Sequence, residues 1–370
     1  MTVPFLDLRA AYLELRREIE EAVARVLASG WYVGGPEVDN FEQAFADYCG
    51  TKHCVGVGNG LDALHLALRA MDVGFGDEVI VASNSYIATV LAVSMVGATP
   101  VLVEPDPRTH NLDPARVEAA LTPRTRVILP THLYGQPADL DPLLELGQRR
   151  GLRLLEDAAQ AHGARYKGRR IGGHGDAVAW SFYPSKNLGA LGDAGAVTTN
   201  DAVLAERIRT LGNYGSHRRY VNEVRGVNSR LDPVQAAVLG LKLRHLEDWN
   251  SRRTAVATHY RQALSGDDLE LPIVPHWAEP AWHLFVIQTD KRELLQQGLA
   301  GTGVETLIHY PIPPHRQQAY ADLGFAWGAF PLAERLAERV LSLPIGPHLS
   351  EEHVAQVVAF AQSALQRLAA

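Results

Sequence analysis

The sequence is poor in cysteine. Only Cys49 and Cys54 occur among its 370 residues, which is too few for a disulfide framework or a cysteine-rich metal site. The 15 histidines include no His-Glu-x-x-His or comparable ligand spacing, so a metal centre has little support. We therefore expect two small buried thiols in a reducing compartment, and no metal.

The sequence also lacks an excess of positive charge. Lysine and arginine number 35 against 42 acidic residues, giving a net charge of −7, so no general basic field exists to attract nucleic acid or an anionic membrane. No uninterrupted apolar run approaches the ~18 residues of a membrane span, and Asp7 interrupts what a signal peptide would need as its apolar core. We expect a cytoplasmic protein that binds any phosphate locally.

Between about residues 50 and 215, short β-branched runs alternate with helical periodicity. Such alternation is typical of a mainly parallel sheet whose buried strands are joined by crossover helices. It predicts an α/β fold with helices on both faces of the sheet. The predicted strands are 53–57, 78–82, 99–103, 126–130, 152–156, 177–182 and 195–199.

The first crossover helix places Leu61, Leu64 and Leu68 on one face and leaves His65 on the other, where we expect it to be solvated. Further along, Asp232 followed by proline predicts the start of a helix that continues toward residue 264. The rest predicts a smaller C-terminal α/β domain, which divides the chain into domains 1–245 and 246–370. Its expected elements are strands at 283–288 and 304–309 and helices near 331–343 and 350–368.

Two residues carry the main chemical signal. Lys186 lies on the connection between the strands at 177–182 and 195–199, and Asp157 ends an earlier strand. A lysine on a rigid turn can form a Schiff base with an aldehyde, and a carboxylate can keep the ring nitrogen of a pyridine cofactor protonated. Taken singly, each residue is more often a solvated lysine or a turn-forming aspartate. Together they indicate pyridoxal 5'-phosphate (PLP) chemistry.

The glycine-rich stretch 56–62 lies between a strand and a helix, where backbone N–H groups can bind a phosphate. A dinucleotide fingerprint is the rival interpretation, but it would require glycine where Leu61 stands. The Ser-x-x-Lys motif of acyl-transferring enzymes also fails, because it would need serine at Tyr183, and the sequence contains no P-loop motif.

Six motifs occur in order along the chain: GNGLDAL (58–64), EDAAQAHG (156–163), SFYPSKNLG (181–189), GDAGA (192–196), NSRLD (228–232) and HYP (309–311). Together they resemble the PLP-dependent nucleotide-sugar aminotransferases of the DegT/DnrJ/StrS group. The resemblance extends from residue 4 to the C-terminus. It implies the aspartate aminotransferase-like fold, PLP fold type I, with a mainly parallel seven-stranded sheet. It also implies a homodimer with shared active sites.

The resemblance assigns cofactor contacts residue by residue. It implies that Lys186 carries the covalent link to PLP, that Asp157 pairs with the pyridine nitrogen, and that Gln160 contacts the ring 3-oxygen. Tyr86 falls where the family has an aromatic residue stacked on the ring. The phosphate would be bound by four residues, the last of them from the partner subunit: Ser181, Gly60, Leu61 and Asn228.

The implied reaction takes an amino group from L-glutamate and gives it to a nucleotide-linked keto sugar. Arg218 and Arg219 form the best local cationic cluster for the sugar's diphosphate, and they align with a family segment that reaches the neighbouring site. An exposed charged loop is the alternative for this pair. Sugar contacts are expected from Tyr183, His309, Tyr310 and His315; packing at a strand end is the alternative for the middle two.

Tyr183, with the following Pro-Ser-Lys, resembles family members that act on 3-keto sugars, whereas those acting at C4 often have histidine there. We therefore expect a dTDP-linked 3-keto-6-deoxyhexose as acceptor. A C4-acting or UDP-sugar aminotransferase of the same family is the alternative. A nicotinamide-dependent sugar oxidoreductase and a catalytically silent regulator are alternatives of other classes. The dehydratase branch has histidine in place of the lysine, and Lys186 argues against it.

Overall fold

The computed structural model describes residues 2–266 and 268–369. A seven-stranded sheet forms its centre, in the order β1-β9-β8-β5-β4-β2-β3. Neighbours from β8 to β3 are parallel, while β9 is antiparallel to both β1 and β8. The predicted α/β class is confirmed. The strands are β1 (His53–Val57), β2 (Glu78–Ala82), β3 (Thr99–Val103), β4 (Thr125–Leu129), β5 (Arg153–Asp157), β8 (Ala177–Ser181) and β9 (Gly195–Thr199).

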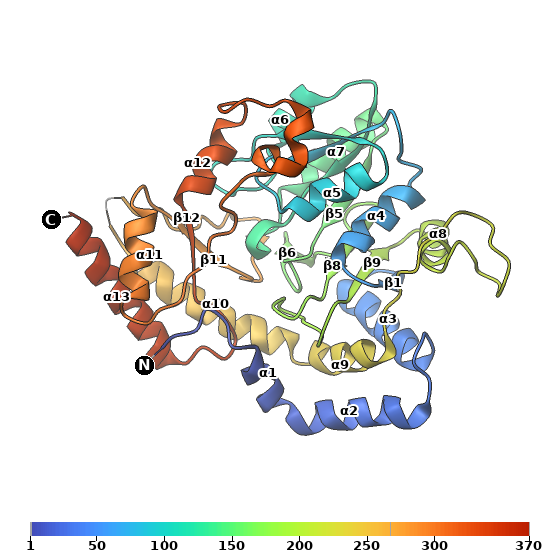
Figure 1. Cartoon of the computed structure of the whole chain (residues 1–370), viewed down its shortest axis with the longest axis horizontal. Coiled ribbons are helices and arrows are strands. Elements are labelled where there is room, and N and C mark those ends of the chain that lie inside the picture. Colours follow the sequence, from blue (N-terminus) through green and yellow to red (C-terminus); the bar gives the residue numbers. More distant parts are fainter. Residues whose placement is uncertain (1, 267, 370) are drawn as a thin grey trace.

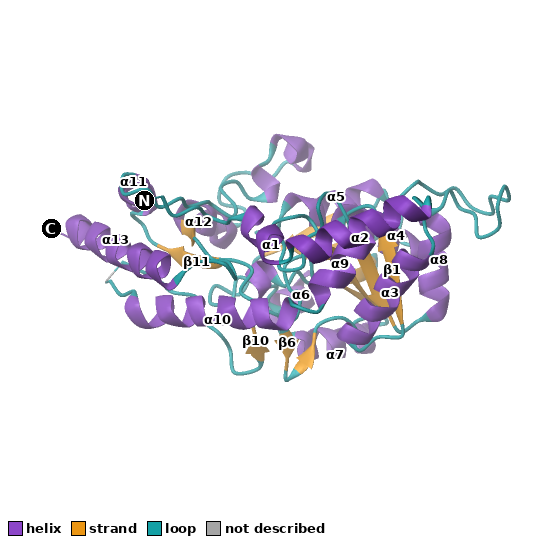
Figure 2. Ribbon diagram, turned by 90° about the horizontal axis from the view of Figure 1, so that it is seen from below, coloured by secondary structure: helices purple, strands orange, loops and turns teal. Residues whose placement is uncertain are grey.

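Helices cover both faces of this sheet (Figures 1 and 2). Alternate strand residues enter different cores, because successive side chains of a strand point to opposite faces: Ile80 of β2 lies in one core and Val81 in the other. The first core includes side chains from α3 (Pro36–Cys49), α6 (Pro114–Ala120), α7 (Leu140–Arg150) and α9 (Pro233–Leu243). The second includes α4 (Gly60–Ala70), α5 (Ile87–Met95) and α8 (Ala202–Gly212).

His65 corrects one expectation. It is 8% exposed, not solvated, because α4 packs against α5 and α8 as well as against the sheet. The helix is therefore covered on more than one side, and the polar stripe that predicts a solvent face is partly enclosed. Burial lowers the pKa of His65, so the ring stays neutral.

The C-terminal region has its own core. It is built around α10 (Leu246–Ala263), α11 (Arg292–Ala300), α13 (Glu351–Ala369), and the antiparallel strands β11 (Phe285–Gln288) and β12 (Val340–Leu343). Val3 is fully buried in this core and pairs with Val304, so the first described residues belong with the last part of the chain. The proposed division at residues 245 and 246 remains a prediction.

Three C-terminal predictions need correction. The expected continuous helix toward residue 264 is broken between α9 and α10, around Arg244. The expected strand at 304–309 is reduced to isolated bridges at Val304 and Leu307. The expected helix at 331–343 ends as α12 (Pro331–Arg339), after which β12 pairs with β11. Apolar runs this short do not distinguish a helix end from a buried strand.

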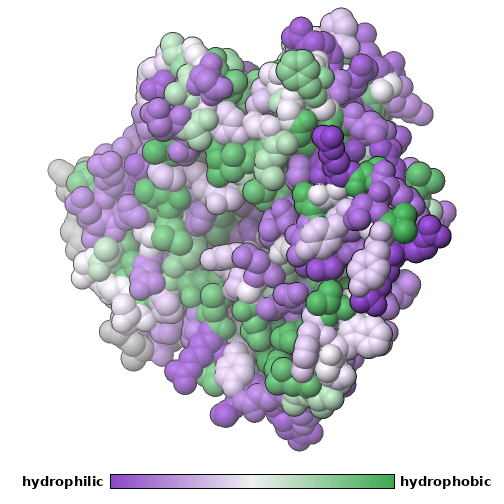
Figure 3. Space-filling model, turned by 45° about the vertical axis from the view of Figure 1, so that its right-hand side comes forward, coloured by the Kyte–Doolittle hydropathy of each residue, from purple (hydrophilic) through white to green (hydrophobic). Residues whose placement is uncertain are grey.

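The remaining elements surround these two parts. No helix within the described ranges is long and apolar enough to cross a membrane. The face in Figure 3 is hollowed near its middle, with green apolar residues beside the hollow and purple hydrophilic residues over most of its periphery. The other elements are α1 (Leu8–Glu14), α2 (Arg16–Ser29), β6 (Arg165–Tyr166), β7 (Arg169–Arg170), β10 (Ala278–Glu279), and the 3-10 turns η1 (Leu133–Gly135), η2 (Pro314–Arg316) and η3 (Gln318–Leu323).

Candidate active site

The candidate site lies at the carboxyl edge of the sheet, where ligands bind in open α/β folds. β5 ends at Asp157 and β8 ends at Ser181, and these two strands are parallel neighbours. The loop after β8 carries Lys186, and the turn after β1 leads into α4 at Gly60. The sheet therefore brings together residues that are far apart in the sequence.

Lys186 lies on a tightly built turn. Its backbone N–H donates to the Tyr183 carbonyl at 2.8 Å, and a Cβ at Gly189 would lie 2.3 Å from the Pro184 oxygen, so only glycine fits that approach. The half-buried Lys186 amine has no hydrogen-bond partner among the described side chains. Burial lowers the pKa of Lys186 to about 8, with the charge of Asp157 opposing it. The neutral, nucleophilic form of this amine is therefore far more populated near neutral pH than that of an ordinary lysine, while the protonated form still predominates at pH 7.

Asp157 is 5% exposed. Its Oδ2 accepts a hydrogen bond from the Thr89 hydroxyl at 2.7 Å, and its Oδ1 accepts one from the Ala159 N–H at 3.1 Å. Burial raises the pKa of Asp157, while these hydrogen bonds and the charge of Lys186 lower it. A buried carboxylate of this kind favours a cationic group beside it, since such a partner restores the ionised form.

Gly60 and Ser181 form a close backbone cradle. A Cβ at Gly60 would lie 2.6 Å from the Ser181 Cβ, so a side chain there would fill the space between them. Asn59 caps α4 by accepting the Asp62 N–H at 2.8 Å, whereas the N–H groups of Gly60 and Leu61 have no acceptor among the described residues. Free N–H groups at a helix start suit an anion such as a phosphate.

Gln160 joins the sheet edge to the C-terminal region. Its Nε2 donates to the Tyr310 hydroxyl at 3.0 Å, and its Oε1 accepts the Tyr134 N–H at 2.6 Å. The ring centroids of Tyr310 and Tyr86 lie 5.0 Å apart. Tyr86 is 51% exposed, so one side of its ring remains available to a planar ligand.

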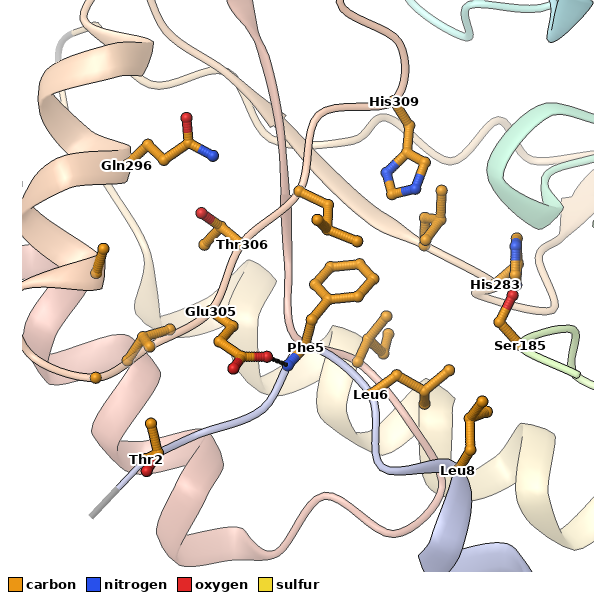
Figure 4. Close-up of a pocket in the computed structure, with 16 residues that line it drawn as sticks. Thr2, Phe5, Leu6, Leu8, Ser185, His283, Gln296, Glu305, Thr306 and His309 are labelled. Carbon is orange, nitrogen blue, oxygen red and sulfur yellow. Dashed lines mark hydrogen bonds between the residues drawn. The ribbon is translucent and has the colours of Figure 1, made fainter.

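A cavity of about 760 Å³ opens beside this site (Figure 4). Ser185, His283 and His309 line one end of it, and Thr2 and Gln296 lie at the other end. Burial lowers the pKa of His309 to about 4 and that of His283 well below 6.5, and the charge of Lys186 adds to both effects. Both rings are therefore neutral near pH 7.

Other predicted residues lie farther out. Tyr183 is 54% exposed. Arg218 and Arg219 are exposed on a loop that projects beyond α8, far from their own chain's sheet edge (Figures 1 and 2). Asn228 is exposed where this loop returns and pairs with Asn213. Arg218 pairs with Val221 within the loop, and no hydrogen bond between described residues joins these loop residues to Lys186.

His315 corrects an expectation about the sugar site. It is 3% exposed, its Nε2 lies 2.9 Å from Oε1 of Glu334, and its ring centroid lies 4.8 Å from that of Phe330. The side chain is fully buried in the C-terminal part, and its Nδ1 has no hydrogen-bond partner among the described residues. The placement indicates a structural residue and does not support the expected sugar contact.

Three residues at the site could not be identified from the sequence. Thr89 contacts Asp157 from α5, Tyr134 contacts Gln160, and His283 lines the cavity. Tyr134 adopts a left-handed conformation, with φ of 62°. None of the three belongs to a recognisable motif, because their positions depend on how separate elements pack.

A family model described as the DegT/DnrJ/EryC1/StrS aminotransferase family matches residues 14–362. This chain belongs to that aminotransferase family. The aminotransferase is 61% identical over 360 residues to "Erythromycin biosynthesis sensory transduction protein EryC1" of Saccharopolyspora erythraea, a match covering 97% of this chain and 98% of that protein.

Two further comparisons are equally extensive. The aminotransferase is 56% identical over 357 residues to a "dTDP-3-amino-3,4,6-trideoxy-alpha-D-glucose transaminase" of Streptomyces venezuelae, covering 96% of this chain and 94% of that one. It also matches the crystal structure of S. venezuelae DesV in complex with a ketimine intermediate, with a TM-score of 0.96, 55% identity and 98% coverage of both chains. The predicted family and its fold are thereby confirmed.

Proposed function

We propose that this protein transfers the amino group of L-glutamate to the C3 keto group of a dTDP-linked 3-keto-6-deoxyhexose, using PLP. The regiochemistry and nucleotide follow from its 56% identity to the dTDP-3-amino sugar transaminase. The single structural observation that carries the proposal is the meeting of Lys186 and Asp157 at one sheet edge, each affecting the other's pKa.

The residues present fit PLP. A cradle between Gly60 and Ser181 that a single Cβ would fill, together with the free N–H groups of Gly60 and Leu61, suits its phosphate. Asp157 would face the ring nitrogen and Gln160 the 3-oxygen, while Tyr86 would lie against the ring. When bound, PLP supplies an electron sink for the substrate carbon that loses its proton.

Lys186 moves the proton in this mechanism. With PLP bound, the free Lys186 amine would be the group that takes a proton from the substrate carbon and holds it for its return. Its pKa of about 8 suits both steps near neutral pH, because an effective acid-base group has a pKa near the working pH. Asp157 stabilises the positive charge on the ring nitrogen, with Thr89 fixing the carboxylate's orientation.

The proposed acceptor needs cations that the cavity itself does not provide. Arg218 and Arg219 are exposed on the loop between α8 and α9, which extends outward from the sheet (Figure 1). We infer that they bind the diphosphate at the partner's site in a homodimer, and that Asn228 contacts the partner's phosphate. Tyr183, His309 and Tyr310 would contact the sugar through their aromatic edges and polar groups.

A direct assay tests the proposal. The purified protein with PLP should be yellow, bleach with glutamate, and then aminate a dTDP-3-keto hexose with ping-pong kinetics. The corresponding 4-keto hexose serves as the comparison acceptor. If the enzyme prefers it, the proposed regiochemistry is wrong, but the reaction class stands. Colour without turnover on any keto sugar would instead favour a silent, regulatory relative.

A further inference from the structure

Apart from His309, the cavity beside Lys186 is bounded by parts of the chain to which the proposed function assigns no role. The segment from Thr2 to Leu8 forms one wall, residues 303–309 form another, and α11 closes the far end (Figure 4). Its volume of about 760 Å³ lies within the range of roughly 300–1,000 Å³ that is usual for small-molecule sites. The cavity is large enough to take part of a substrate.

The cavity wall offers no cation to a ligand. Among its described lining residues none is lysine or arginine, and the one carboxylate, Glu305, already accepts the Phe5 N–H at 3.1 Å. An anionic diphosphate would lose its hydration here without gaining a cation. The cavity therefore suits the neutral part of a substrate and leaves the diphosphate outside.

Hydrogen bonding fixes the protonation of His283. The Asn187 Nδ2 donates to the Asn250 Oδ1 at 2.9 Å and to the Ala281 carbonyl at 2.7 Å, so its Oδ1 is the atom that faces the His283 Nδ1 at 3.2 Å. The His283 Nδ1 must then carry the hydrogen, which leaves Nε2 as an acceptor. No described residue donates a hydrogen bond to this Nε2.

Phe5 supplies an apolar surface opposite this polar end. Its ring lies between the two ends of the cavity and faces His309, with ring centroids 5.9 Å apart and an interplanar angle of 31°. Leu6 and Leu307 extend the same surface. A ligand here meets an aromatic face on one side and a hydrogen-bond acceptor on the other.

We propose that this cavity is a subsite for the deoxyhexose ring of the acceptor, in which the His283 Nε2 accepts a hydrogen bond from a ring hydroxyl and Phe5 packs against the C6 methyl group. This inference rests on the proposed function and adds the residues that select a 6-deoxy sugar. A C6 hydroxyl in place of the methyl hydrogen would be buried against Phe5 without a partner.

The apolar contact is tested by comparing two acceptors, one with a C6 methyl and one with a C6 hydroxymethyl group. The wild-type ratio of their kcat/KM values should favour the methyl compound by about 10- to 100-fold. Phe5→Ser should reduce that ratio by about tenfold, and Phe5→Leu should preserve it. The matched control is Phe75→Ser, since Phe75 is 98% exposed and does not line the cavity. An unchanged ratio in Phe5→Ser would overturn the contact, because a general loss of folding lowers both values equally.

The polar contact is tested by separating the two half-reactions. His283→Phe should slow the sugar half-reaction by about tenfold more than the glutamate half-reaction, and His283→Gln, whose amide oxygen can accept, should recover part of the loss. Equal effects on both halves would refute the hydroxyl contact. A wild-type protein that aminates neither sugar would instead refute the proposed function.

Discussion

The two sides of the active site are built in different ways. The side proposed to bind the cofactor comes from one sheet edge: Asp157 and Ser181 end adjacent parallel strands, and Lys186 follows the second. The side proposed to bind the sugar comes from the N-terminal segment and the C-terminal region, with Phe5 and His309 as neighbours. The first side needs only the sheet, whereas the second needs distant parts of the chain to pack together.

A few polar contacts hold the second side in place. Oε1 of Glu104, just after β3, accepts the Leu332 N–H at 2.7 Å, and its Oε2 accepts the Ala333 N–H at 3.0 Å, at the start of α12. The Ser94 and Tyr320 hydroxyls meet at 3.0 Å. These contacts tie the segment that follows Tyr310 back to the sheet and its helices.

Replacing Lys186 should have the largest effect, and this effect should be confined to the cofactor side. Lys186→Ala removes both the covalent attachment and the acid-base group, so turnover should fall by at least about 10⁴-fold. The exposed Lys52 provides the control, since Lys52→Ala should keep wild-type turnover. Single-turnover assays with glutamate measure the effect, and retained activity in Lys186→Ala would refute the catalytic assignment.

A smaller effect on the same side should come from filling the phosphate cradle. Gly60→Val places side-chain carbon against Ser181, where even a Cβ lies 2.6 Å away, so PLP affinity should fall by about tenfold or more. Gly74→Ala is the matched control, because its nearest atom would be the Val96 oxygen at 3.8 Å. Fluorescence titration with PLP measures both, and equal affinities would place the phosphate elsewhere.

Loosening the substrate side should give a milder and selective change. Glu104→Ala removes the acceptor at the start of α12 and should raise KM for the keto sugar several-fold, at a stability cost of about 1 kcal/mol. Asp201 caps α8 in the same manner, at 2.9 and 3.1 Å, but lies away from the site. Asp201→Ala should therefore cost similar stability with unchanged KM; if both variants behave alike, Glu104 has no role in positioning.

The smallest change concerns pH. Burial lowers the pKa of Lys186 to about 8, against ~10.4 for an ordinary lysine, so its neutral form grows as pH rises through 8. In the PLP-free protein, acylation of Lys186 followed by mass spectrometry should show a midpoint near pH 8. Asp157→Asn should lower that midpoint, because the Asp157 charge favours the protonated amine; a midpoint near 10 would contradict the buried setting.

The comparison also explains what the sequence could predict. All seven strands of the central sheet match the predicted runs or differ from them by one residue at one or both ends. Asp157 ends a strand and Lys186 lies on the connection between β8 and β9, as predicted, since local spacing determines both positions. The predicted solvent exposure of His65 is wrong, and the burial of His315 does not support its predicted sugar contact. Packing against other elements buries both side chains. The roles of Phe5, His283 and Glu104 depend on tertiary packing and leave no local signal.

The order in which the chain is synthesised limits when this wall of the cavity can form. Val3 is buried against Val304, and Phe5 bonds to Glu305, 300 positions later. Val3 and Phe5 must therefore remain without these partners until residues 304 and 305 have been synthesised. The sheet with its lysine can assemble during translation, but the wall that the sugar would touch can close only at the end.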